Sequence, residues 1–239
     1  MSFNFTEGEV LLIDKPIGWT SFDVVNKIRN AIRNFLREQE TPGHNNSGKI
    51  KVGHAGTLDP LATGLLIVCT GKFTKRIDEF MAQEKEYTGE FTFGASTPTY
   101  DAEMPADATF ACDNLSEEKI IKATESFVGT IQQIPPMYSA IKQEGKKLYE
   151  LARKGVSVEL KPREVFVKEF ELSNFELPKV NFRIVCSKGT YIRSIAHDLG
   201  KAVDNGAYLS SLRRTRIGDH KIEDALQVME FVERLKLGN

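Results

Sequence analysis

The chain has 239 residues, of which 41% are hydrophobic and 27% charged, and its formal net charge is −1. This balance is typical of a globular protein and excludes a disordered chain, a collagen-like rod and a small disulfide-stapled scaffold. No apolar run approaches the ~20 residues needed to cross a bilayer, and the first residues lack the pattern of a secretion signal. Cys69, Cys112 and Cys186 are far apart in the sequence and lack CxxC spacing, so we expect no zinc site and a reducing, cytoplasmic compartment.

Charge is distributed unevenly along the chain. Residues 1–140 contain 13 Lys and Arg against 19 Asp and Glu, whereas residues 141–221 contain 17 against 10, a net charge of +7 for the later segment. A basic segment of this kind can neutralise RNA phosphates and release counterions. Considered alone, the charge favours the simpler interpretation of a solvated basic face on a helix or strand.

Hydrophobic periodicity predicts the elements of the first half. An apolar run predicts a strand over 9–14, and helical spacing predicts a helix that begins at Thr20 or Ser21 and ends near Arg37. Residues 41–49 are polar and Gly-rich, which is typical of a loop. The elements expected next are a strand at 51–52, an irregular loop at 53–64, a buried strand at 65–69, a helix at 72–81 and an alternating strand at 87–94.

The second half is expected to begin with a loop over 97–115. A helix over 116–127, capped by Ser116, ends before Ile134-Pro135-Pro136. The remaining elements expected are a short basic helix at 146–154, strands at 156–172 and 180–186, and helices at 189–203 and 224–235. Strands and helices mix without a βαβ rhythm, which predicts an α+β fold around a mixed, largely antiparallel central sheet flanked by helices and loops.

One loop is a candidate for a catalytic site. The sequence lacks the motifs of nucleotide hydrolysis, hydride transfer, serine hydrolases and zinc proteases. Residues 53–64, GHAGTLDPLATG, combine three glycines, a histidine and an Asp-Pro pair. Glycine permits close approach or positive φ, and an aspartate before proline projects its carboxylate from a turn. This setting suits a catalytic acid, although an arbitrary Asp-Pro is more often a structural turn.

This loop resembles the catalytic loop of the TruB family, the bacterial tRNA pseudouridine-55 synthases. Other segments resemble family motifs in the same order: DKPIGWTS at 14–21, EY at 86–87, QIPPMYSAIK at 133–142 followed by Gly145 and YELAR at 149–153, CSKGTYIR at 186–193, and LRR at 212–214. The resemblance spans about residues 9–226 and favours a catalytic role for Asp59. It implies the pseudouridine synthase fold in a single catalytic domain over residues 1–239, with an RNA-gripping thumb segment at about 130–160 and no PUA domain.

The resemblance implies an enzyme that converts uridine 55 in the T-arm of tRNA to pseudouridine without a cofactor or metal ion. Asp59 corresponds to the family's essential aspartate, which either attacks ribose C1′ or abstracts a ribose proton. Arg193 corresponds to the arginine that keeps this carboxylate ionised and oriented, because a solvent-free pocket raises a carboxyl pKa above ~3.9. Tyr87 corresponds to the tyrosine beside the target base and completes the implied catalytic set.

Four residues are implied to bind the substrate. Tyr87 would stack on uracil, and because a phenol has an ordinary pKa of ~10, its action as a base would need assistance. His54 corresponds to a histidine near the extruded nucleotide, which must leave the folded T-loop before it can react. Tyr191 and Leu212 correspond to positions that line the base pocket. Considered alone, each of the four would be an ordinary core, strand or loop residue.

The basic residues of the later segment are expected to contact tRNA phosphates. They are Lys142, Lys146, Arg153, Lys154 and Arg163. Lys15 and Pro16 of the first motif are expected to support the catalytic loop from behind. The resemblance further implies a monomer that acts on the T-arm, with no membrane and no obligate protein partner.

Two other functions fit part of the pattern. A non-catalytic RNA-binding module that folds or remodels tRNA would need the basic segment but not Asp59. A hydrolase using His54 and Asp59 as an acid–base pair would release free uracil and leave an abasic site, but the loop lacks a second carboxylate. Substitution of Asp59 and analysis of the product separate these three functions.

Overall fold

The computed structural model describes residues 3–38, 50–143, 145–156 and 158–237. The chain divides into two compact units. Unit 1 comprises Met1–Lys85 and Arg213–Asn239, and unit 2 comprises Glu86–Leu212. Strand β12 (Ala207–Ile217) contributes its first residues to unit 2 and its last residues to unit 1. The predicted loop at 41–49 lies outside the described residues.

Unit 1 is built on a mixed sheet with the strand order β14-β1-β3-β12, to which β2 adds beside β3 and β13 beside β12. β1 runs antiparallel to β3 and parallel to β14. The elements are β1 (Val10–Lys15), α1 (Ser21–Glu38), β2 (Val52–His54), β3 (Ala62–Thr70), a 3-10 helix at Gly71–Arg76, α2 (Ile77–Ala82), β13 (His220–Lys221), a 3-10 turn at Ile222–Asp224, β14 (Leu226–Gln227) and α6 (Val228–Lys236).

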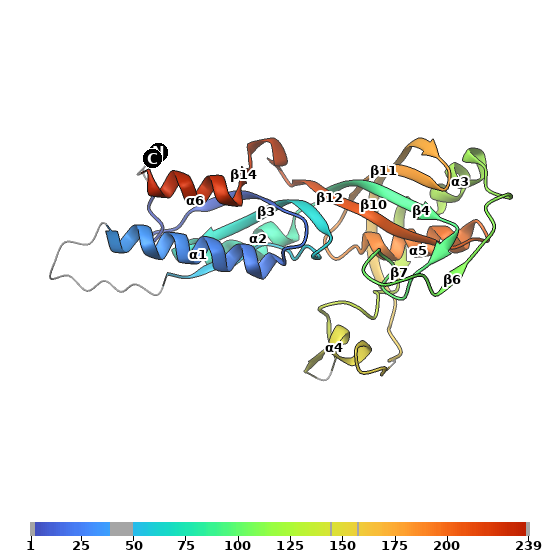
Figure 1. Ribbon diagram of the computed structural model, residues 1–239, viewed down its shortest axis with the longest axis horizontal. Coiled ribbons are helices and arrows are strands. Elements are labelled where there is room, and N and C mark those ends of the chain that lie inside the picture. Colours follow the sequence, from blue (N-terminus) through green and yellow to red (C-terminus); the bar gives the residue numbers. More distant parts are fainter. Residues whose placement is uncertain (1–2, 39–49, 144, 157, 238–239) are drawn as a thin grey trace. The chain divides into compact units, whose positions relative to one another are not determined.

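Strand β3 is covered on both faces, which explains its unbroken apolar run. On one face Leu66 packs in a core with Ile28 of α1 and Phe231 of α6. On the other face Leu65 packs in a second core with Phe80 of α2. Because alternate residues of a strand point to opposite faces, a strand buried on both faces needs apolar residues at every position. Helices α1 and α6 pack side by side over the first of these cores (Figure 1).

The predicted start of the first helix is confirmed by its cap. The backbone N–H of Asp23 donates to Oγ1 of Thr20 at 3.1 Å, and the backbone N–H of Thr20 donates to Oδ2 of Asp23 at 2.9 Å. This reciprocal pair is a capping box with aspartate in the acidic position, and it satisfies two backbone donors that a helix start leaves free. The described part of the helix extends to Glu38, one residue beyond the predicted end.

Unit 2 is built on a sheet with the strand order β12-β4-β11-β10-β7, in which β10 runs antiparallel to both β11 and β7. Its elements are β4 (Lys85–Phe93), β5 (Ala95–Ser96), β6 (Ala108–Thr109), α3 (Glu117–Thr124), a 3-10 turn at Glu125–Phe127, β7 (Gly129–Gln133), β8 (Lys142–Gln143), β9 (Lys146–Lys147), α4 (Leu148–Ala152), β10 (Arg163–Glu176), β11 (Lys179–Cys186) and α5 (Ile192–Ala202).

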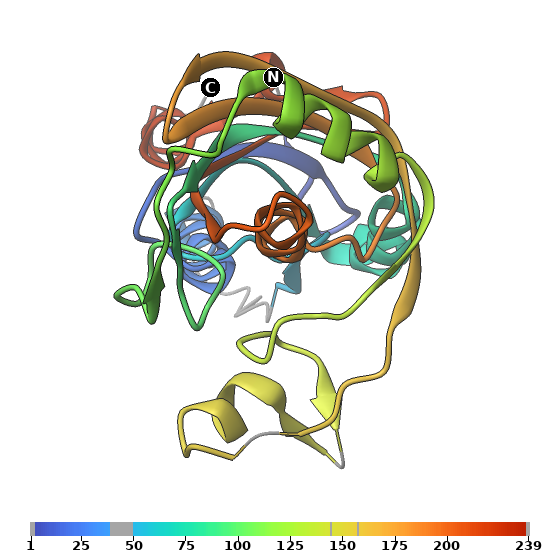
Figure 2. The ribbon, with the colours of Figure 1, turned by 90° about the vertical axis from the view of Figure 1, so that its right-hand side faces the viewer.

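Aromatic rings of three strands pack against one another in unit 2. The ring of Phe91 in β4 stacks on that of Phe182 in β11 at 4.1 Å and meets the edge of Phe170 in β10 at 6.2 Å. Helix α5 buries Ile195 and Leu199. In Figure 2 the part of the thumb segment that carries α4, drawn in yellow, lies apart from the strands of the unit 2 sheet. The predicted α+β class with a largely antiparallel sheet is confirmed.

Several predicted boundaries in the second half are wrong. The helix predicted over 116–127 is confirmed as α3 and the 3-10 turn that ends at Phe127, but strand β7 separates it from the prolines, so the prolines do not end the helix. Strand β10 begins at Arg163, seven residues later than predicted, and only residues 148–152 of the basic helix predicted at 146–154 are helical. Strand β12 was not predicted at all, and the last helix begins at Val228 instead of 224.

Smaller differences concern two other segments. β3 starts at Ala62, three residues before the predicted strand, and the loop predicted at 97–115 contains the second strand of the β5–β6 pair. Within the described ranges, no helix is both long and apolar enough to cross a lipid bilayer.

Candidate functional site

The loop at 55–61 joins two neighbouring antiparallel strands of unit 1. His54, the last residue of β2, lies opposite Val68 of β3. The backbone N–H of Ala62 donates to the carbonyl oxygen of Asp59 at 3.0 Å, which closes a turn with Pro60 in its second position. Proline favours that position because its φ is already near −65°. The structure therefore places Asp59 at the start of a tight turn, where its side chain is half-buried.

Glycine is required in strand β3 just after this loop. Gly64 has φ of +105°, and a Cβ atom there would clash with the backbone carbonyl of Arg214 in the adjacent strand β12. Gly56 also has positive φ, at +95°. These conformations are unfavourable for residues with a side chain, so the glycines predicted to shape the loop do so through their backbones.

The peptide groups on both sides of Asp59 are anchored to the DKPIGWTS segment. The Ser21 hydroxyl donates to the carbonyl oxygen of Leu58 at 3.2 Å and accepts from its N–H at 2.9 Å. The N–H of Gly18 donates to the carbonyl oxygen of Pro60 at 2.8 Å. Because the residues before and after Asp59 are both fixed, the position of its carboxylate is restricted before any substrate binds.

Lys15 supports this arrangement from the interior. Its side chain is fully buried, and its ammonium group donates to the carbonyl oxygens of Trp19 at 2.6 Å and Pro60 at 3.4 Å. Burial lowers the pKa of Lys15 to about 8, and the nearby Asp59 carboxylate opposes this shift. The attraction is mutual, so a charged Lys15 favours the ionised form of Asp59. The expected supporting role of Lys15 is confirmed.

A buried arginine, Arg214, forms a second support. Its side chain is 1% exposed, and it donates to the carbonyl oxygens of Leu65 at 2.8 Å and Gly56 at 3.0 Å. The sequence singled out Arg214 only as part of the LRR motif. Its burial was missed because an arginine between polar residues is typical of a protein surface, and its carbonyl partners are distant in sequence.

The neighbouring Arg213 forms a paired ionic contact that the sequence also did not predict. Its guanidinium donates to both carboxylate oxygens of Asp14, at 3.1 and 2.8 Å, and the amide of Gln227 donates to one of them at 2.9 Å. A bidentate pair of this kind is directional as well as strong. It joins β1, β12 and β14 beside the segment that anchors the loop.

His54 keeps an unused hydrogen-bonding atom. Nδ1 of its half-buried imidazole has no hydrogen-bond partner among the described residues. Burial lowers the pKa of His54, the charge of Arg214 lowers it further, and a backbone hydrogen bond with Gly56 opposes both. The imidazole is therefore neutral near pH 7 and able to stack on a base or form one more hydrogen bond.

In unit 2 the predicted arginine is buried and held by three groups. Arg193 of α5 is 4% exposed and donates to the carbonyl oxygens of Thr99 and Tyr138, each at 3.0 Å. Its Nε lies 3.5 Å from Oδ2 of Asp101, which is also buried. Arg193 is therefore not a basic residue on an exposed helix face. The carboxylate of Asp101 as a partner was not predicted, because it lies in the irregular segment after β5.

The other residues expected to bind the base also lie in unit 2. Tyr87 is buried in β4, as its alternating pattern predicted. Tyr191 precedes α5, where its N–H donates to Oε1 of Gln133 at 2.8 Å and its carbonyl accepts from Nε2 of Gln133 at 3.1 Å. Leu212 is half-buried in β12. His54 and Asp59 belong to unit 1, so the pairing of Asp59 with Arg193 stays a prediction.

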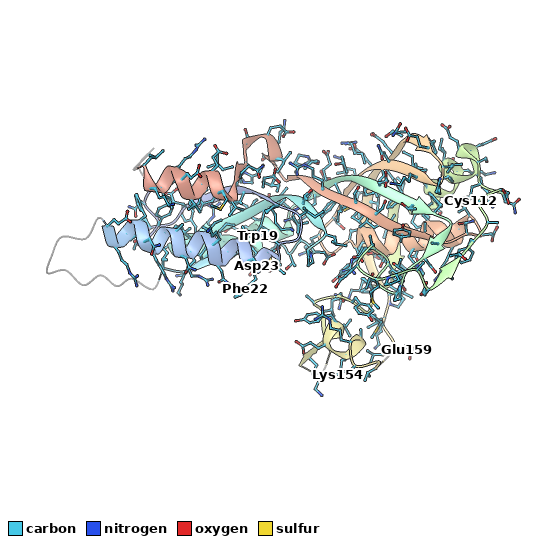
Figure 3. All side chains as sticks on the ribbon, viewed as in Figure 1. Trp19, Phe22, Asp23, Cys112, Lys154 and Glu159 are labelled. Carbon is cyan, nitrogen blue, oxygen red and sulfur yellow. The ribbon has the colours of Figure 1, made fainter. Side chains whose placement is uncertain are left out.

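The residues expected to contact phosphates are mostly exposed. Lys146, Arg153, Lys154 and Arg163 are all exposed, and Lys154 is labelled at the thumb segment in Figure 3. Arg153 lies over the ring of Tyr149 at 5.6 Å and within 3.9 Å of Glu103. The side chain of Lys142 lies outside the described residues. In the part of the chain that the structure describes, no three His, Cys, Asp or Glu side chains could hold a metal ion.

Comparison with known proteins decides the family. A sequence model described as "TruB family pseudouridylate synthase (N terminal domain)" matches residues 44–192, more than half of the chain. The chain belongs to the TruB family. Its fold is therefore the pseudouridine synthase fold, and the sequence resemblance is confirmed.

Curated TruB relatives match nearly the whole chain. The tRNA pseudouridine synthase B of Flavobacterium johnsoniae is 50% identical over 232 residues, which cover 97% of this chain and 98% of that protein. The protein of the same name from Phocaeicola vulgatus is 52% identical over 232 residues, which cover 97% and 95%.

Solved structures also share the fold. A chain in the crystal structure of a Cbf5-Nop10-Gar1 complex has a TM-score of 0.69 and 30% identity, and covers 96% of this chain. A chain in the structure of an H/ACA ribonucleoprotein bound to a substrate RNA containing 2′-deoxyuridine has a TM-score of 0.67 and 27% identity. This chain spans only about half of those two chains, 54% and 56%.

Proposed function

We propose that this TruB-family chain isomerises uridine 55 in the T-arm of tRNA to pseudouridine. The observation that carries the proposal is its 50–52% identity, over 97% of its length, to proteins named tRNA pseudouridine synthase B. In the reaction the bond between ribose C1′ and base N1 breaks and a bond between C1′ and C5 forms. C5 loses a proton and N1 gains one, so substrate and product have the same atoms and we expect no cofactor or metal ion to take part.

Asp59 is the proposed catalytic carboxylate, either as a nucleophile at C1′ or as a base for a ribose proton. Both roles require an ionised carboxylate in a fixed position. The anchored turn and the charge of Lys15 support both requirements. We propose that Arg193 provides a second cation when the substrate occupies the site, and that Asp101 holds the Arg193 guanidinium in place.

The remaining predicted residues receive roles that suit their side chains. Tyr87 stacks on the extruded uracil and lies close to the C5 proton. Tyr191 and Leu212 line the base pocket. His54, with Nδ1 unused, contacts the RNA that the target nucleotide leaves.

The thumb segment is the proposed grip on the RNA backbone. Its exposed basic residues Lys146, Arg153 and Lys154, with Arg163 after it, neutralise phosphates of the T-arm. We further propose that residues 1–239 act together as one catalytic domain, as a monomer in the cytoplasm.

The decisive experiment compares the wild type with Asp59→Ala and Asp59→Asn. Purified proteins are incubated with tRNA, pseudouridine is mapped at base resolution, and tRNA affinity is measured by filter binding. We expect the wild type to modify position 55, and both variants to form no product while their affinity stays within about tenfold, or ~1.4 kcal/mol. Asp219→Asn, an exposed change in the same unit, is the control and should modify at the wild-type rate. Product formation by the Asp59 variants would contradict the proposal.

The same experiment separates the two alternatives. A non-catalytic RNA-binding module would bind tRNA and leave position 55 unmodified in the wild type. A hydrolase would release free uracil, which chromatography of the reaction detects, and would leave an abasic site in place of pseudouridine.

A further inference from the structure

One side of helix α1 carries a line of polar and basic residues with an aromatic residue at its start. Residues three or four positions apart in a helix are neighbours on its surface. The line, which we name the α1 stripe, consists of Phe22, Asn26, Arg29, Arg33 and Arg37. At 1.5 Å per residue it extends for ~22 Å. The stripe is distinct from the buried side of the helix, which holds Val24, Val25, Ile28 and Ile32.

The α1 stripe borders the strand that leads into the candidate catalytic loop. The guanidinium of Arg29 donates to the carbonyl oxygen of Val52 in β2 at 3.1 Å and to Oδ1 of Asn26 at 2.9 Å. β2 ends at His54, directly before the loop. At the other end of the stripe, Phe22 follows Ser21, whose hydroxyl is bonded to Leu58. The stripe therefore starts beside the turn that holds Asp59.

Large apolar side chains are exposed around this start. Phe22 is 63% exposed, and Figure 3 labels it at the first turn of α1. Ile17 is 65% exposed and Leu61 37% exposed, on two segments joined by the hydrogen bond from Gly18 to Pro60. One exposed apolar residue needs no explanation, but three on the segments that hold a catalytic loop indicate a surface that a bound group covers.

Two further arginines of the stripe lie in the second half of α1. Arg33 is half-buried and Arg37 is exposed. Over the described ranges of the chain, no carboxylate forms an ion pair with either of them. Arg29 differs, because its guanidinium is already bonded to Val52 and Asn26.

We infer that the α1 stripe binds the same tRNA on which the loop acts. Phe22 stacks on an unpaired base next to the target nucleotide, and Arg33 and Arg37 contact phosphates of the strand that leads away from it. Aromatic side chains stack on bases of RNA loops, and arginines bind phosphates. The positive charge of the stripe favours a polyanion as its ligand. Because the stripe starts beside the Asp59 turn, we infer that this polyanion is the substrate RNA. The inference rests on the proposed function, because that function supplies the RNA.

The first test removes the two arginine charges. Arg33→Gln/Arg37→Gln is compared with Arg234→Gln/Lys236→Gln, a control on α6 that removes two exposed charges from the same unit. The Kd for unmodified tRNA is measured by filter binding across a salt series, with thermal unfolding to confirm that each variant is folded. We expect the stripe variant to bind at least fivefold more weakly. The slope of log K against log salt should become shallower by about 1.4–1.8, because two phosphate contacts are lost and each contributes about 0.7–0.9 to the slope. Equal affinities and slopes for the two variants would overturn the inference.

The second test concerns the aromatic residue. Phe22→Ala should weaken tRNA binding at least fivefold, the lower end of what loss of one base stack costs. Phe22→Trp restores a flat aromatic surface and should recover wild-type affinity. Wild-type affinity in Phe22→Ala, or failure of Phe22→Trp to recover, would show that Phe22 does not stack on the RNA.

Failure of this inference is distinguishable from failure of the proposed function. If the wild type modifies position 55 but the stripe variants bind like their controls, the proposed function stands and the α1 stripe is not an RNA surface. If the wild type binds tRNA through the stripe without modifying it, the RNA surface stands and the proposed function fails.

Discussion

The ammonium group of Lys15 in β1 interacts electrostatically with the carboxylate of Asp59 and donates to the turn that holds it. Lys15 has no exposed surface, and it donates to the carbonyl oxygen of Pro60, the residue after Asp59, at 3.4 Å. Burial lowers the pKa of Lys15 to about 8, while Asp59 acts in the opposite direction. A cation in this position both fixes the turn and favours the charge that the proposed chemistry requires.

This pKa predicts how stability depends on pH. An unfolded lysine titrates near 10.5, so between about pH 8 and 10.5 the unfolded chain binds more protons than the folded chain. The contribution of Lys15 to the free energy of unfolding therefore increases with pH in this window. We expect the free energy of unfolding of the wild type, measured in urea relative to Lys15→Met, to increase by about 2 kcal/mol between pH 7.5 and 9.5. Parallel stability curves for the two proteins would show that Lys15 has an ordinary pKa.

The hydrogen bonds between Ser21 and Leu58 predict a positioning effect. Ser21→Ala removes both bonds and leaves the peptide before Asp59 without its anchor. We expect a loss of about 1–3 kcal/mol in unfolding free energy and a fall in single-turnover rate, with tRNA affinity within about threefold. Ser126→Ala, which removes an exposed hydroxyl bonded to Ala123, is the control. A wild-type rate in Ser21→Ala would mean that the turn keeps its position without this anchor.

Arg193 offers a test of guanidinium geometry. Arg193→Lys keeps the charge but loses the planar fork that bonds Thr99 and Tyr138. We expect turnover to fall about 100-fold or more while tRNA affinity changes less than about threefold. Arg183→Lys, in the partly exposed network of unit 2, is the control and should retain turnover. Turnover at the wild-type rate in Arg193→Lys would exclude Arg193 as the cation that acts on Asp59.

Asp101 should be needed to keep Arg193 in place. Asp101→Asn removes the negative charge beside a buried guanidinium, and removal of one member of a buried ion pair costs about 3 kcal/mol or more. We expect lower unfolding free energy and reduced turnover, both measured on the same preparation. Full stability in this variant would show that the carbonyl groups alone hold the guanidinium.

The thumb segment predicts a salt-dependent contribution to binding. Lys146→Gln/Lys154→Gln removes two exposed charges, and the slope of log K against log salt should become shallower by about 1.4–1.8. Combined with the α1 stripe variant, the two changes in slope should add, because each lost phosphate contact lowers the slope by its own amount. An unchanged slope would exclude the thumb residues as phosphate contacts.

The sequence predicted elements whose signal is local. Thr20 and Asp23 cap α1 three residues apart, and the Asp59-Pro60 turn is visible as a dipeptide. The resemblance to the TruB motifs added the candidate site residues. Strand β12 was missed because Arg213 and Arg214 read as surface residues, and their partners Asp14 and Leu65 are about 150 to 200 positions away. The burial of Arg193 against Asp101 was not predicted either, because the two residues are far apart in the sequence.

Unit 1 is assembled from the two ends of the chain, and this has a consequence for biosynthesis. During translation the turn with Asp59 leaves the ribosome some 150 residues before Arg213 and Arg214 do. Until then Asp14 and the carbonyl group of Gly56 lack the partners that fix them. The turn with Asp59 therefore lacks these supports until strand β12 emerges, whereas the other strands of unit 2 have by then been synthesised.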